Sequence, residues 1–275
     1  MAAGGTVLGL VGSPDREGRT FHLVTAALEG AAKAGARVEL VQMADHVVKP
    51  CQDCLAWECA TKLKCQYADP AFDYLSSRLL ESGALVLGAP VYWWDTSGLV
   101  RYLMLKMLRV YARSAPLAGL PAFGIAIAGG TGNGLVSGLR PLYHFFHALQ
   151  MRALEPLPVT RFNWTAALER AGELGAQLAP VAGTRQPFPS LEERLLWYDS
   201  LPYLSLNWAG QRRLLAALVT TALPTGADPA VARSLAEAEA LAARGETLHS
   251  LQEITHVYEA GVRVFEDSQG DASAN

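Results

Sequence analysis

Short apolar runs alternate with longer amphipathic stretches over most of this chain of 275 residues. Runs that are apolar on both faces are typical of strands in a buried parallel sheet. Five such runs predict strands at 6–12, 37–43, 84–90, 122–130 and 152–159. The amphipathic stretches predict helices at 20–35, 69–83, 97–114, 134–150 and 163–181. This alternation predicts an α/β fold, with helices on both faces of one parallel sheet.

The rules for strand connections leave few topologies, and the leading one for five strands is the flavodoxin-like order 2-1-3-4-5. The pattern changes after residue 182, where a stretch with Gly and Pro predicts a linker at 183–194. Beyond it only helical periodicity is found, followed by a polar tail that we expect to be disordered. We therefore expect an α/β domain at 1–182 and an all-helical C-terminal extension at 195–275.

Composition and charge narrow the class of protein. Hydrophobic residues make up 51% of the chain, and the net charge of -3 gives no basic surplus for a nucleic-acid partner. No run approaches the roughly 20 apolar residues of a membrane span, and the N-terminus does not resemble a signal peptide. We therefore expect a cytoplasmic protein, in a reducing compartment that disfavours structural disulfides.

Three loops follow the predicted strands at the carboxyl edge, where ligands of open parallel sheets bind. Residues 12–20, GSPDREGRT, combine hydroxyls, basic groups and a helix start, which favours an anion cradle; the alternative is an ordinary polar turn. Residues 89–98 place three adjacent aromatics on a loop, suited to a planar ligand or to packing against other helices. Residues 128–134 contain four glycines, which allow the backbone to approach a ligand closely.

These three loops resemble those of the NAD(P)H-dependent FMN reductase and iron–sulfur flavoprotein family. The resemblance spans roughly residues 6–180. It implies a flavodoxin-like fold that binds FMN without a covalent bond. For the phosphate it implies Ser13, Arg16, Gly18, Arg19 and Thr20, where Arg19 replaces the family's usual Asn. For the isoalloxazine ring it implies Pro90, Val91, Tyr92, Trp93 and Trp94, and for the far edge of the ring Gly129, Gly130, Thr131 and Gly132.

All four cysteines lie in one loop at 50–66, after the second strand, with the spacing C-x2-C-x4-C-x5-C. In the iron–sulfur flavoproteins a similar loop, C-x2-C-x2-C-x(4–7)-C, holds a 4Fe–4S cluster. The resemblance therefore implies Cys51, Cys54, Cys59 and Cys65 as cluster ligands, although Trp57 stands where the third cysteine is expected. The alternatives are a four-thiolate zinc site, a redox-active pair at Cys51 and Cys54, and a relative that has lost its cluster.

The leading hypothesis is an FMN-dependent oxidoreductase of iron–sulfur flavoprotein type, which transfers electrons between the cluster and FMN. NAD(P)H or ferredoxin is the expected donor, and the resemblance implies a homodimer or homotetramer. A second hypothesis is an NAD(P)H-dependent FMN or quinone reductase with zinc or no metal. A third, suggested by the C-terminal helices, is a non-catalytic electron carrier or complex subunit. We also expect Asp95 to cap the helix that begins near Ser97.

Overall fold

The computed structural model describes residues 5–54, 58–223 and 229–272, with side chains up to residue 268. Internal contacts divide the chain into two compact units, and each is described separately. The sheet unit comprises Met1–Ala128, Gly134–Val159 and Thr165–Leu204. The helical unit comprises Gly129–Asn133, Thr160–Trp164 and Ser205–Asn275.

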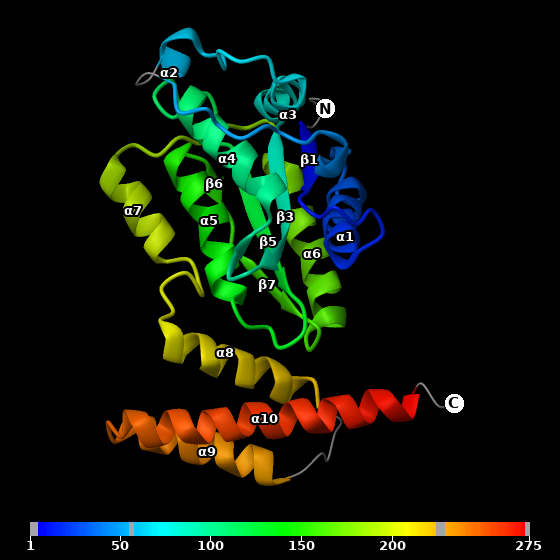
Figure 1. Ribbon diagram of the computed structural model, residues 1–275, viewed down its shortest axis with the longest axis vertical. Coiled ribbons are helices and arrows are strands. Elements are labelled where there is room, and N and C mark those ends of the chain that lie inside the picture. Colours follow the sequence, from blue (N-terminus) through cyan, green and yellow to red (C-terminus); the bar gives the residue numbers. More distant parts are fainter. Residues whose placement is uncertain (1–4, 55–57, 224–228, 273–275) are drawn as a thin grey trace. The chain divides into compact units, whose positions relative to one another are not determined.

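A parallel sheet forms the centre of the sheet unit (Figure 1). Its strands are β1 (Thr6–Val11), β2 (Arg37–Gln42), β3 (Ala84–Tyr92), β5 (Pro121–Ala128) and β6 (Arg152–Ala153), in the order β2-β1-β3-β5-β6. This order is the predicted 2-1-3-4-5, and it confirms the fold class. β3 and β5 are buried over almost their whole length, as expected for central parallel strands.

The fifth predicted strand is interrupted. Instead of one strand over 152–159, the chain forms β6 and then β7 (Leu157–Thr160), which also pairs with β5. Pro156 and Pro158 lack the backbone N–H that a continuous ladder needs, which accounts for the break. A further short strand, β4 (Asp95–Thr96), runs antiparallel to β3 and forms a hairpin with it.

Helices cover both faces of the sheet (Figure 1). α1 (Arg19–Lys33) and α6 (Trp164–Leu178) lie on one side, and α4 (Gly98–Tyr111) and α5 (Leu135–Ala148) on the other. The backbones of α1 and α6 touch, since a Cβ added to Gly30 would lie 1.9 Å from the carbonyl oxygen of Gly172. A Cβ on Gly175 would lie 1.8 Å from that of Ala27, so both positions require glycine.

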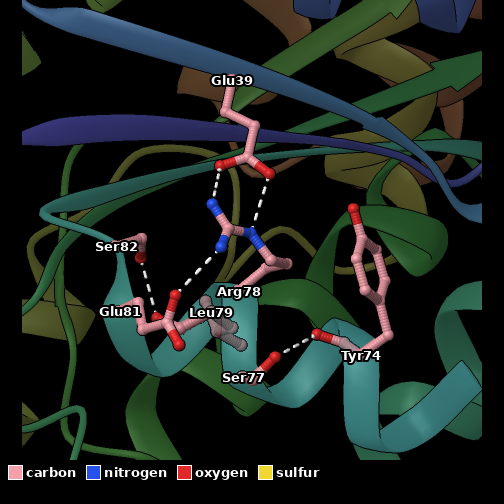
Figure 2. A network of polar contacts seen from close by, with 7 residues as sticks. All are labelled: Glu39, Tyr74, Ser77, Arg78, Leu79, Glu81 and Ser82. Carbon is pink, nitrogen blue, oxygen red and sulfur yellow. Dashed lines mark hydrogen bonds and ion pairs between the residues drawn. The ribbon is translucent and has the colours of Figure 1, made fainter. Parts of the chain in front are cut away.

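The helix α3 (Pro70–Glu81) connects the cysteine loop with β3. Its Arg78 pairs with both carboxylate oxygens of Glu39 on the edge strand β2, with 2.8 Å between Nε and Oε1 (Figure 2). Arg78 also contacts Glu81 one turn further along the helix, at 2.9 Å. The pKa of Arg78 is raised, mainly by the hydrogen bond with Glu39. The pair attaches α3 to the edge of the sheet.

α7 (Leu191–Asp199) also belongs to the sheet unit. Trp197 Nε1 donates to the carbonyl of Ala153, and the Tyr198 hydroxyl donates to that of Met151, each at 2.8 Å. These contacts join the first residues of the expected helical extension to the sheet. The boundaries 1–182, 183–194 and 195–275 stay a prediction. The remaining short helices of the sheet unit are η1 (Met43–Asp45), α2 (Glu58–Lys62) and η2 (Ala179–Val181).

The helical unit is built from α8 (Trp208–Thr221), α9 (Pro229–Ala243) and α10 (Thr247–Ala272), with α10 packed against the other two. Buried side chains such as Val219 and Val257 form its core. α10 continues to Ala272, into the stretch expected to be a disordered tail. In the part of the chain that the structure describes, no helix is both long and apolar enough to cross a membrane.

Candidate flavin site and cysteine loop

The phosphate loop (residues 12–18) ends at an open helix N-terminus. Gly18 is the N-cap of α1, no side chain caps the helix, and its first turn holds no acidic residue. N–H groups that no side chain caps, together with the helix dipole, therefore favour an anion here. Ser13 and Thr20 are both buried at this end. Ser13 Oγ accepts from the Asp15 N–H at 3.1 Å, so its hydroxyl hydrogen can still donate to an anion.

The two arginines of this region are exposed. Arg16 forms a bidentate ion pair with Asp45 of η1, with 2.7 Å between Nη1 and Oδ2. The hydrogen bond between them raises the pKa of Arg16 and lowers that of Asp45. An anion in the loop would have to share Arg16 with this carboxylate. Arg19 is the first residue of α1, directly beside the open N-terminus.

Three hydrogen bonds join the phosphate loop to neighbouring strand ends. The Gly12 N–H donates to Gly88 of β3 at 2.8 Å, and Ser97 Oγ donates to the Gly12 carbonyl at 2.6 Å. Gln42, the last residue of β2, donates to the Ser13 carbonyl at 2.6 Å. A Cβ at Gly12 would lie 2.2 Å from Val100 Cγ2, so only glycine fits where the phosphate loop passes this side chain of α4. The loop is therefore fixed directly beside the aromatic segment that follows β3.

That segment, the aromatic hairpin (residues 90–97), turns sharply. Tyr92 pairs with Asp95, which leaves Trp93 and Trp94 as a two-residue turn with φ values of 52° and 59°. Two left-handed residues define a type I′ turn, which normally prefers Asn-Gly. The Trp93 side chain is 88% exposed, and its ring meets that of Trp94 edge to face at 5.4 Å. A strained turn that presents large aromatics to solvent is a common mark of a binding site.

The remaining predicted residues of this hairpin lie at its base, where Pro90 is buried and Val91 half-buried. Asp95 does not cap α4, contrary to expectation. Its carboxylate instead accepts from Arg101 Nε at 3.1 Å, and Ser97 caps the helix. Ser97 lies directly before the first helical residue, the position where a side-chain oxygen best reaches the open N–H groups.

Two buried side-chain atoms at these loops lack a hydrogen-bond partner within the described residues. They are Oε1 of Gln42, beside the phosphate loop, and Oγ1 of Thr96, in the aromatic hairpin. A buried polar atom without a partner is costly and often marks a ligand site. Sequence reasoning missed Gln42, Thr96 and Ser97. A polar residue at the end of a buried strand was the available signal for Gln42.

The glycine loop, Gly129–Asn133, groups with the helical unit. Gly129 and Gly130 are exposed, and the Thr131 carbonyl accepts from the Tyr258 hydroxyl at 2.5 Å. A Cβ at Gly132 would lie 2.8 Å from Leu215. The other two predicted flavin loops belong to the sheet unit, so the flavin role of the glycine loop stays a prediction.

The cysteine loop (residues 50–66) contains the short helix α2. Cys59 is buried, whereas Cys51, Cys54 and Cys65 are half-buried. Trp57, which stands at the expected third ligand position, lies outside the described residues. Among the described residues, no three Cys, His, Asp or Glu side chains form a group that could hold a metal ion.

The pKa of one of these thiols nevertheless responds to the other three. Burial raises the pKa of Cys54, and the negative charges of Cys59, Cys51 and Cys65 raise it further. Burial and the neighbouring thiolates both disfavour the charged form of Cys54, and a bound cation would stabilise that form. The donor set suits a thiolate-ligated metal or cluster, although it is not gathered into one.

The sheet order, the open α1 N-terminus and the aromatic hairpin define a flavodoxin-like α/β protein. The family model described as NADPH-dependent FMN reductase matches residues 6–157, more than half of the chain. The chain therefore belongs to this family of flavin-dependent oxidoreductases, which confirms the resemblance found in the sequence.

Curated relatives point to the same group. An iron-sulfur flavoprotein of Methanocaldococcus jannaschii is 35% identical over 98 residues, 36% of this chain and 49% of that protein. An iron-sulfur flavoprotein of Archaeoglobus fulgidus is 28% identical over 125 residues, 46% of this chain and 55% of that protein. The chain thus spans about half the length of the curated relatives it matches.

Solved structures share the fold. A flavone reductase superposes with a TM-score of 0.52 at 16% identity and covers 69% of each chain. An NAD(P)H:quinone oxidoreductase from Methanothermobacter marburgensis superposes with a TM-score of 0.51 at 16% identity. It covers 64% of this chain and 96% of the other. At this identity the likeness supports the fold alone.

Proposed function

We propose that this chain is an FMN-dependent oxidoreductase that passes electrons between FMN and a 4Fe–4S cluster on the cysteine loop. One observation carries the flavin half of the proposal. The phosphate loop leads to the open N-terminus of α1, and its Gly12 is hydrogen-bonded to Gly88, just before the aromatic hairpin, and to Ser97, the last residue of the hairpin. An anion cradle and an aromatic surface at adjacent strand ends suit a ligand with one phosphate and one planar ring.

The residues present fit FMN. The phosphate would meet the N–H groups at the start of α1 together with Ser13 and Thr20, with Arg16 and Arg19 supplying positive charge nearby. Tyr92, Trp93 and Trp94 would offer aromatic surface to the ring, above Pro90 and Val91 at the base of the hairpin. Thr96 Oγ1 and Gln42 Oε1 are buried polar atoms that the bound cofactor could satisfy. When bound, FMN supplies one- and two-electron transfer, and the protein supplies its position and surroundings.

The cluster half rests on the donor set and on the relatives, which are iron-sulfur flavoproteins. Cys51, Cys54, Cys59 and Cys65 would be its ligands, and each thiol must lose a proton to bind iron. The raised pKa of Cys54 works against deprotonation in the metal-free loop. We therefore expect iron uptake to release protons and to weaken as the pH falls. A zinc site, or free thiols in a simple NAD(P)H-dependent FMN or quinone reductase, is the alternative.

Anaerobic purification with flavin, iron and acid-labile sulfide analysis tests both halves together. We expect about one FMN and about four iron atoms per chain, with matching sulfide. Flavin without iron would favour the reductase without a cluster. Iron without flavin would overturn the flavin site. A Cys59→Ser variant is the matched control, because it should lose iron and keep flavin.

The electron donor and the assembly are parts of the same proposal. We propose NAD(P)H or ferredoxin as donor and a homodimer or homotetramer as the working form. Oxidation of NADPH, NADH and reduced ferredoxin with flavin and quinone acceptors separates an enzyme from an electron carrier, because a carrier would turn over with none of them. Light scattering of the purified protein gives the oligomeric state.

A further inference from the structure

A buried ion pair lies at the base of the cysteine loop. Asp69 is 1% exposed and Lys106, on the third turn of α4, is 4% exposed. Asp69 Oδ2 pairs with Lys106 Nζ and also accepts from the Lys49 N–H at 2.9 Å. Its Oδ1 accepts from the Phe72 N–H at 3.2 Å and so caps α3. One carboxylate thus joins three separate parts of the chain.

These contacts close the cysteine loop. Lys49 directly precedes it and Asp69 follows it by three residues, so the bond from the Lys49 N–H to Asp69 holds the two ends together. A second bond, from Lys49 Nζ to the Ala68 carbonyl at 3.2 Å, closes the same ends. The position of the loop therefore depends on where Asp69 is held. Lys106 holds it from α4.

α4 also links this base to the aromatic hairpin. The helix begins at Gly98, directly after the hairpin, and its other end lies beside α2 of the cysteine loop (Figure 1). Lys106 lies about 12 Å along the helix axis from Gly98, at about 1.5 Å per residue. One turn further, Arg109 donates to the Cys54 carbonyl at 3.1 Å. The helix that starts at the proposed flavin site therefore contacts the cysteine loop at its base and at a proposed ligand.

The cavity beside this pair reaches a cysteine. It has a volume of about 260 Å³ and is lined by Lys49, Cys65, Tyr67 and Lys106, among others. A buried ion pair is weak evidence for stability, because a well-packed apolar pair often stabilises a fold as much or more. Buried charge can instead select one arrangement among several. Here that arrangement is the distance between the cysteine loop and α4.

We propose that Asp69 and Lys106 are positioning residues, which fix the cysteine loop on α4 at a set distance from the proposed flavin site. The pair acts through the backbone at Lys49 and the start of α3, and it need not touch iron or flavin. The proposal deepens the proposed function and rests on it for the role of the cysteines. The positioning role can be tested in the metal-free protein, where the result does not depend on iron binding.

The test compares full-length variants in the metal-free state. Asp69→Asn keeps an oxygen that can cap α3, but it removes the negative charge that pairs with Lys106. Its amide NH2 group would face the Lys49 N–H, so the hydrogen bond that joins the two ends of the cysteine loop is lost. Lys106→Met removes the positively charged partner of Asp69, whereas Lys106→Arg keeps a positive charge at this position. Asp69→Asn/Lys106→Met leaves no unpaired buried charge and guards against loss of folding. Glu39→Gln is the matched control, because it breaks an ion pair between α3 and β2 that lies away from the cysteine loop.

The first readout is the rate of alkylation of buried Cys59, followed by mass spectrometry. We expect Asp69→Asn and Lys106→Met to raise this rate about 10- to 100-fold, the range for a lost hydrogen bond to a charged group. Lys106→Arg should stay nearer the wild type, and Glu39→Gln within about twofold of it. Equal rates in Asp69→Asn and Glu39→Gln would overturn the proposal. The double variant should stay fast if it folds, since the neutral pair no longer holds Lys49.

The second readout is the electron paramagnetic resonance spectrum after anaerobic reconstitution with iron and sulfide. We expect a broadened or weaker cluster signal in Asp69→Asn and an unchanged one in Glu39→Gln. If the wild type takes up no iron, the cluster assignment fails, while the Cys59 rates still decide the positioning role. If the wild type binds iron, and Asp69→Asn changes neither the rate nor the spectrum, the positioning role fails and the proposed function stands.

Discussion

The turn of the aromatic hairpin gives a prediction in which stability and binding respond differently. Trp93 occupies a left-handed conformation at φ 52°, and its side chain is 88% exposed. An ordinary residue in this region costs about 1–2 kcal/mol relative to a right-handed one. Asparagine tolerates the conformation better. Trp93→Asn should therefore relieve strain at the turn. It should lose little buried apolar surface, because the Trp93 side chain is already exposed.

The opposing loss comes from the edge-to-face contact with Trp94, at 5.4 Å. Such a pair contributes about 0.5–1.5 kcal/mol beyond area burial. The two effects nearly cancel, so we expect the free energy of unfolding of the flavin-free protein to stay within about 1 kcal/mol of the wild type. A buried tryptophan would lose about 3–5 kcal/mol on truncation. Stacking of a ring on an aromatic side chain contributes about 1–3 kcal/mol, so FMN should bind about 5- to 150-fold more weakly.

Urea unfolding of the flavin-free protein, followed by circular dichroism, measures the first quantity. Titration of FMN followed by flavin fluorescence measures the second. Leu196→Asn is the control, because it replaces an exposed apolar residue on α7 and should bind FMN like the wild type. An unchanged FMN affinity in Trp93→Asn would remove Trp93 from the ring site. A stability loss above about 3 kcal/mol would refute the strained-turn argument.

Three further predictions follow from separate contacts. Ser13→Ala should weaken FMN about tenfold and leave riboflavin binding unchanged, because riboflavin lacks the phosphate; equal weakening of both in calorimetry would contradict the phosphate role. Glu39→Gln should lower the free energy of unfolding by about 1 kcal/mol, through loss of the half-exposed pair with Arg78 (Figure 2), and the stability of the variant should fall less with added salt than that of the wild type. Burial alone would raise the pKa of Asp69, but hydrogen bonds, chiefly from Lys106, lower it overall. Its stabilisation is therefore present above its unfolded pKa of about 3.9 and lost as the pH falls through the lower folded value, so acid titrations of Asp69→Asn should show a shallower loss.

Much of the fold followed from periodicity. β3 and β5 are apolar on both faces, and the strand order follows from connection rules that hold for any such alternation. Helix ends were predictable where local chemistry decides them, as at the start of α3, where Asp69 caps the helix and Pro70 is its first residue. The phosphate loop and the aromatic hairpin could be singled out as candidate sites, because each directly follows a strand at the carboxyl edge.

Pairings between distant residues could not be predicted in this way. Lys106 lies on the buried face of α4 with Leu103 and Met107, and a lysine in an apolar stripe signals a buried partner. The sequence does not say that the partner is Asp69, 37 residues earlier. The positive φ at Trp93 was equally hidden, since tryptophan carries no preference for a left-handed turn and tertiary contacts impose the conformation.

The contact between α1 and α6 has a consequence for the order in which the protein forms. Gly30 meets the backbone of Gly172, and Gly175 meets that of Ala27, across more than half of the chain length. During synthesis the first strand and helix emerge well before their last partner, so the face of α1 that carries Ala27 and Gly30 stays uncovered until residue 175 has left the ribosome. Closing such a long loop is slow compared with local pairing. A chain truncated before α6 should therefore expose this face to chaperones, even though it contains every described strand from β1 to β7.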